Sequence, residues 1–133
     1  MTNDAFHQMV EEATKARLDM AMQKGREYAN EQEDRNFNFK IIATLLGIEP
    51  ETVAMVYKLK HILSMCTYIK DLEQGKPREL VEPIEGRIDD DQNYSDLLRG
   101  IIRDRDTGKL RIAALASCEI AQEIERRLFE KND

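Results

Sequence analysis

The chain is poor in residues that interrupt helices or staple small folds together. Its 133 residues include 3 prolines, 6 glycines, 2 cysteines and no tryptophan. So few helix breakers, together with a charged fraction of 35%, favour helices with solvated outer faces. Cys66 and Cys118 lie in apolar helical patterns without the spacing of a Cys/His metal site, so we expect two buried free thiols.

Long apolar runs and a surplus of basic residues are also lacking. No apolar run approaches the ~20 residues that span a bilayer, and the first residues do not show the basic-then-apolar pattern of a signal peptide. We therefore expect a cytoplasmic protein without a membrane partner. The 20 basic and 26 acidic residues give a net charge of −6, which argues against duplex nucleic acid as a ligand. A small anionic ligand is compatible with this balance, because its site needs only local positive charge.

Apolar residues recur at helical spacing in five segments, and Gly47 and Gly75 mark helix ends. We expect an all-α, antiparallel bundle of about five helices in one domain, 1–133. The expected helices cover about residues 4–30, 38–46, 50–73, 83–103 and 109–131. The turn at 106–108 allows an alternative, a β-hairpin between Ile102 and Leu110, but the strong helix formers that follow favour a helix.

An acidic residue continues the apolar stripe of the fourth predicted helix. Asp90 lies in line with Tyr94, Leu97 and Ile101, and Asn93 is nearby. A carboxylate at such a position must be paired, bound to a metal or protonated, because burying it bare costs several kcal/mol. A satisfied structural aspartate at the end of a helix is an equally good interpretation.

Two further predicted helices repeat this arrangement. In the first, Phe6, Ala13 and Met20 are spaced seven residues apart, and the next position in this series is Glu27. In the third, the pair Lys60-His61 interrupts an apolar segment. Apolar stripes face one another in a bundle, and carboxylate metal sites are built between helices in this way. The structural alternative for a lone histidine is a satisfied core residue.

Basic residues accompany these carboxylates in the predicted bundle. Arg35, Lys40 and Lys60 come from segments adjacent to the acidic positions. Carboxylates that hold a divalent ion on one side, with Lys and Arg on the other, suit a ligand that carries phosphates.

The order of these motifs resembles a family of small uncharacterised proteins found largely in bacteriophages and prophages. The similarity covers residues 24–102 and rests on Lys24-Gly-Arg-Glu-Tyr28, Asp34-Arg35, Asn38-Phe-Lys40, Lys60-His61 and Asp90-Asp-Gln-Asn93-Tyr94. That family in turn resembles the all-α nucleoside triphosphate pyrophosphohydrolases of the MazG and dUTPase type, and the domains associated with nucleotide modification.

The resemblance implies a Mg²⁺-dependent hydrolase that converts a nucleoside triphosphate or a modified nucleotide into a monophosphate and pyrophosphate. It implies Mg²⁺ ligands at Glu27, Glu31, Glu85, Asp89 and Asp90, of which Glu27, Glu85 and Asp90 would be catalytic. The implied ligand-binding residues are Tyr28, Arg35, Asn38, Lys40, Lys60, His61, Arg87, Asn93 and Tyr94.

Two alternatives remain open on the residues alone. Glu27 and Glu31 are four apart, whereas the hydrolase pattern spaces its glutamates by three. An incomplete ligand set leaves open a non-catalytic phage protein that sequesters a nucleotide, such as a defence signal of the host, or that binds a host protein. A purely structural role for every polar residue is the other alternative. We also expect a homo-oligomer, in which residues 109–131 pack within the subunit or between subunits.

Overall fold

The computed structural model describes residues 1–28, 34–106, 122, 124 and 126, and every element within them is a helix. This confirms the all-α expectation for the described residues. The helices are α1 (Asn3–Tyr28), α2 (Phe37–Leu46), α3 (Pro50–Glu73) and α4 (Ile84–Asp106). Ile102 belongs to α4, so the hairpin alternative is wrong. Most of the predicted fifth helix, 109–131, lies outside the described residues.

Two glycines end helices where the sequence predicted. Gly47 follows α2 in the left-handed region with φ 66°, and Gly75 follows α3 with φ 64°. After α2 the N–H of Gly47 donates to the carbonyl of Thr44, and that of Ile48 donates to the carbonyl of Ala43. Such paired bonds satisfy the last carbonyls of a helix and need a residue that tolerates positive φ.

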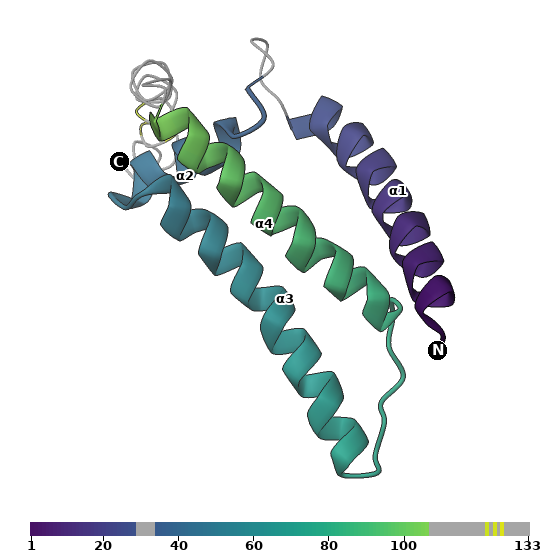
Figure 1. The fold of residues 1–133 in the computed structure, drawn as a ribbon. Helices are drawn as coiled ribbons and strands as arrows, with labels where there is room; N and C mark the ends of the chain where they lie inside the picture. Colours follow the sequence, from purple (N-terminus) through teal and green to yellow (C-terminus); the bar gives the residue numbers. More distant parts are fainter. Residues whose placement is uncertain (29–33, 107–121, 123, 125, 127–133) are drawn as a thin grey trace.

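α2, the start of α3 and the end of α4 meet at one end of the molecule. Figure 1 shows α3 and α4 running antiparallel along their length, with α1 on the other side of α4 and α2 near the start of α3. The buried apolar side chains lie where α2, α3 and α4 converge: Phe39, Ala43, Val53, Ala54 and Ile101. The partly buried Tyr94, Leu97 and Leu98 pack against them, as expected for the α4 stripe.

A buried lysine fixes the chain before α2 to the end of α4. Lys40 is 4% exposed, and its Nζ lies 2.7 Å from Asp34 Oδ2 and 3.2 Å from Asp104 Oδ2. The side-chain amide of Asn36 donates to the same Asp104 carboxylate at 3.1 Å. These contacts satisfy a charge that would otherwise be costly to bury.

The predicted buried stripe of α1 is wrong. Phe6 and Met20 are 50% and 48% exposed, and Glu27 is exposed as well. The shielded positions are instead Thr14, Arg17, Ala21 and Gly25, of which Thr14 and Ala21 follow Ala13 and Met20 by one residue, about 100° around the helix. The physical reason is that Arg17 binds Asp96 of α4 at 2.6 Å, which rotates the apolar series away from α4.

The expected burial of Cys66 is also wrong, because this free thiol is exposed on α3. Cys118 lies outside the described residues. None of the helices formed by the described residues is both long and apolar enough to cross a membrane.

Candidate functional site

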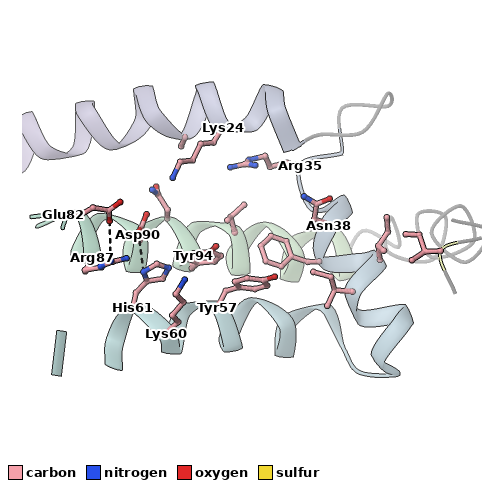
Figure 2. A pocket seen from close by; sticks show the side chains of 17 residues that line it. Lys24, Arg35, Asn38, Tyr57, Lys60, His61, Glu82, Arg87, Asp90 and Tyr94 are labelled. Atoms are coloured by element: carbon pink, nitrogen blue, oxygen red, sulfur yellow. Dashed lines mark ion pairs between the residues drawn. The ribbon is translucent and has the colours of Figure 1, made fainter. Parts of the chain in front are cut away.

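A cavity of about 690 Å³ lies between the four helices and contains most of the predicted ligand-binding residues. This volume is within the range of small-molecule sites. Its polar lining comes from every helix and from the segments beside them, and Figure 2 shows these side chains converging from both sides of α4. The polar lining residues are Lys24, Arg35, Asn38, Lys60, His61, Glu82, Arg87, Asp90 and Asn93.

Aromatic rings form the floor of the cavity. Tyr57 of α3 and Tyr94 of α4 are stacked, with ring centroids 5.7 Å apart and planes at 4°. His61, one turn after Tyr57, also stacks on Tyr94 at 5.3 Å and 22°. Phe39 meets both tyrosines edge-on, at 6.2 Å and 6.3 Å, so the stack is anchored to the apolar core. Tyr57 is nevertheless 41% exposed.

Two of the predicted site residues, His61 of α3 and Asp90 of α4, lie next to each other in this cavity. His61 is 7% exposed, and its Nδ1 lies 3.4 Å from Asp90 Oδ2 without hydrogen-bond geometry. Burial lowers the pKa of His61, and the charges of Lys60 and Arg87 lower it further, while Asp90 opposes them. The neutral imidazole is therefore favoured over the charged form.

Cations outnumber carboxylates around the cavity. Arg87 lies 3.5 Å from Glu82, whereas Lys24, Arg35 and Lys60 have no ion pair with any residue in 1–28 or 34–106. The Arg35 guanidinium is positioned by α1, since a Cβ on Gly25 would lie 3.5 Å from Arg35 Nε. This is an ordinary van der Waals distance, so the Arg35 side chain packs against α1 beside Gly25.

The structure brings eight of the predicted site residues to this cavity: Arg35, Asn38, Lys60, His61, Arg87, Asp90, Asn93 and Tyr94. Lys40 does not line it, because its ammonium group is bound to Asp34 and Asp104 instead. Tyr28 is the last residue of α1.

The carboxylates predicted as Mg²⁺ ligands are not gathered in the same way. Asp90 lines the cavity, whereas Glu27, Glu85 and Asp89 do not, and Glu31 lies outside the described residues. In the part of the chain that the structure describes, no three His, Cys, Asp or Glu side chains lie close enough together to hold a metal ion. Among the described residues the predicted Mg²⁺ ligands are therefore not gathered into one site, and Mg²⁺ binding stays a prediction.

Sequence reasoning missed Lys24, Tyr57 and Glu82 as lining residues. A signal for Tyr57 was present, because it precedes His61 by four residues and so shares its face of α3. Lys24 lacked such a signal, since its position in the cavity depends on the rotation of α1.

No family model, curated protein or solved structure matches the chain. The resemblance to phage proteins and to the MazG type therefore stays a prediction.

Proposed function

We propose that this protein binds a small nucleotide in the cavity between its helices, holding the phosphates with lysine and arginine side chains. The observation that carries the proposal is the group formed by Lys24, Arg35 and Lys60, three cations at one cavity without a carboxylate partner in the described residues. Gathering like charges raises the electrostatic energy of the free protein, and a phosphate chain would relieve it.

The aromatic floor supports a nucleoside rather than a bare phosphate. Tyr57 combines an exposed ring surface with fixed orientation, because it is stacked on Tyr94 and held at its edge by Phe39. Stacking of a base on such a ring is worth ~1–3 kcal/mol and does not depend on which base it is. The two asparagines of the lining, Asn38 and Asn93, add donors and acceptors for the base or sugar.

Binding without hydrolysis is the favoured form of the proposal. It needs the cations and the aromatic floor, and it does not need the carboxylates that the resemblance implies as Mg²⁺ ligands. A protein of this kind would act by lowering the free concentration of its nucleotide, which is the sequestering role given above as an alternative to hydrolysis.

Mg²⁺-dependent hydrolysis is the second candidate. The observation in its favour is the Asp90 carboxylate, which lies among the cations of the lining with Glu82 nearby. Mg²⁺ is commonly held by one or two carboxylates together with the phosphates of the substrate, so a metal could arrive with the nucleotide.

Titration calorimetry of the full chain with ATP, other nucleoside triphosphates and inorganic triphosphate tests the proposal. We expect Lys60→Gln to weaken binding of all these ligands by about tenfold or more, since a hydrogen bond to a charged group is worth ~1.5–3 kcal/mol. Tyr57→Leu should weaken the nucleotides alone and leave inorganic triphosphate unchanged. Lys15→Gln, an exposed position of α1 outside the cavity, is the matched control.

Binding in EDTA and the products formed after incubation with Mg²⁺ then separate sequestration from hydrolysis. Binding in EDTA with no change in the nucleotide after incubation with Mg²⁺ supports sequestration. Appearance of monophosphate and pyrophosphate, lost in Asp90→Asn, would replace it by hydrolysis. The absence of binding to every ligand would contradict both, and would leave the structural role for these residues.

A further inference from the structure

Asp90 is a carboxylate of the cavity wall that no lysine or arginine of the described residues neutralises. It lies among the basic residues of the lining, yet its ion pair within residues 1–28 and 34–106 is with His61 alone. Glu82, which also lines the cavity, lies 3.5 Å from Arg87. The Asp90 side chain is 27% exposed. Its oxygens are therefore placed to accept hydrogen bonds from a ligand, and bonds to an ionised acceptor are the stronger kind.

The imidazole of His61 presents a second polar atom without a partner. His61 is 7% exposed, and its Nδ1 has no hydrogen bond with any described residue. This atom lies 3.4 Å from Asp90 Oδ2 and donates nothing to it. We therefore place the proton of the neutral ring on Nε2, which leaves a lone pair on Nδ1. Two acceptors then lie side by side, and a ligand with N–H groups would satisfy both.

Both acceptors lie one helical turn from the aromatic floor. Asp90 precedes Tyr94 by four residues on α4, and His61 follows Tyr57 by four on α3. One turn rises ~5.4 Å, which is about the reach of a stacked purine to the polar groups at its edge. Figure 2 shows Asp90 and His61 on one side of Tyr94 along α4, and Arg35 on the other. A stacked base can therefore turn its edge toward the acceptors and its phosphates toward the cations.

The base edge that complements neighbouring acceptors is one that carries neighbouring N–H donors. In guanine, the ring N1–H and the exocyclic amino group lie side by side on the Watson–Crick edge. A carboxylate accepts from both, and the second amino hydrogen remains for another acceptor. Adenine and cytosine instead place a ring nitrogen that accepts beside their amino group, and uracil places its N–H between two carbonyls. Such acceptors would face the Asp90 carboxylate with like charge, which disfavours these bases.

We propose that the cavity selects guanine nucleotides: the Asp90 carboxylate accepts from the ring N1–H and the amino group, and His61 Nδ1 accepts from the second amino hydrogen. This inference rests on the proposed function, because it names the base of the nucleotide whose phosphates the cations hold. It gives Asp90 a role in recognition of the base, and this role needs no metal ion.

Titration calorimetry of the full chain in EDTA tests the selection with GTP, ITP, ATP, UTP and inorganic triphosphate. ITP keeps the ring N1–H of GTP and lacks its amino group. We expect GTP to bind at least about tenfold more tightly than ITP, ATP or UTP, because each of them loses a hydrogen bond to a charged group. ATP should still bind more tightly than inorganic triphosphate, since stacking on Tyr57 does not depend on the base.

Asp90→Asn distinguishes recognition of the base from a structural role. The amide would turn a donor toward the N–H groups of guanine, so the preference for GTP over ATP should fall at least about tenfold. Inorganic triphosphate should bind as tightly as before or more tightly, because a negative charge has been removed from the cavity. A purely structural aspartate would instead leave the ratio of the two affinities unchanged. Asp19→Asn, the same change at an exposed position of α1, should keep the preference.

The possible results separate this inference from the proposed function. Equal affinity for GTP, ITP and ATP, each above that of inorganic triphosphate, would overturn guanine selection and leave nucleotide binding intact. A preference for GTP that survives Asp90→Asn, or that appears only when Mg²⁺ is added, would overturn the direct contact between Asp90 and the base. No binding of any ligand in the series would overturn both proposals.

Discussion

At the scale of single residues, Lys40 has a different environment from the other lysines near the cavity. The sequence placed it with Arg35 and Lys60 as a phosphate-binding residue, but it is buried and bound to Asp34 and Asp104. The environment of a lysine depends on which carboxylates the fold brings near it. Here Asp104 is 64 residues away in the sequence, so no local pattern could indicate the pair.

We expect Lys40→Met to destabilise the protein by about 3 kcal/mol. The change leaves the Asp34 and Asp104 carboxylates partly buried without their cation, which is the costly way to break a buried pair. Urea unfolding measures the effect, and Lys15→Met at an exposed position should change stability by less than about 0.5 kcal/mol. Loss of ligand affinity with unchanged stability would instead restore the phosphate-binding role of Lys40.

His61 gives the protein a predictable response to pH. Its pKa in the folded state lies below that of an unfolded histidine, chiefly because it is buried. The unfolded chain therefore binds this proton at a higher pH than the folded chain does. Stability from the neutral side chain is fully present above the unfolded pKa of about 6.5, and it is lost as the pH falls toward the folded value.

We expect the wild type to lose more stability than His61→Gln as the pH falls from 7.5 to 5.5. The additional loss cannot exceed about 1.4 kcal/mol for each pH unit, because one proton is involved. Urea unfolding at several pH values measures it, with His7→Gln as a control at an exposed histidine. Identical pH dependence in wild type and His61→Gln would contradict the prediction.

At the scale of helices, local chemistry accounts for most of the observed bounds. α2 ends at Leu46 before Gly47, and α3 begins at Pro50 and ends shortly before Gly75, all as predicted. These signals act through φ angles and backbone hydrogen bonds within a few residues, so the sequence contains them in full.

Two glycines should respond to alanine in opposite directions. Gly47→Ala should cost about 1 kcal/mol, because alanine is strained at φ 66°. Gly86→Ala, within α4 and with open space around its Cβ, should stabilise the protein by up to about 1 kcal/mol through helix propensity. Thermal unfolding of both variants measures these changes in stability. A shift of the melting temperature in the same direction for both variants would contradict the roles given to the two glycines.

The rotation of a helix is less local than its bounds. For α4 the predicted stripe is confirmed, because Ile101 is buried in the core and Tyr94 and Leu97 pack against it. For α1 an ion pair from Arg17 to Asp96 and the small residues Ala21 and Gly25 set the rotation instead. An apolar series predicts a buried face only where apolar contacts decide how the helix packs.

At the scale of the whole molecule, polar contacts connect the helices alongside a small apolar core. In the described residues five apolar side chains are buried, namely Phe39, Ala43, Val53, Ala54 and Ile101. Lys58 binds Asp91 between α3 and α4 at 2.5 Å, and Arg17 binds Asp96 between α1 and α4. The outer face of α3 leaves Val56, Leu59 and Leu63 exposed in the single chain.

The sequence by itself determined the helical class, the ends of α2 and α3, and eight of the residues around the cavity. Propensity and capping are sufficient for the helical class and the helix ends, because they act over a few residues. The residues around the cavity came from the polar residues on the predicted apolar stripes and from the family resemblance. The tertiary structure alone decided that Lys24 lines the cavity, that Lys40 does not, and that α3 exposes an apolar face. Each of these depends on how whole helices are rotated and which charges meet across them, and those contacts join residues far apart in the chain.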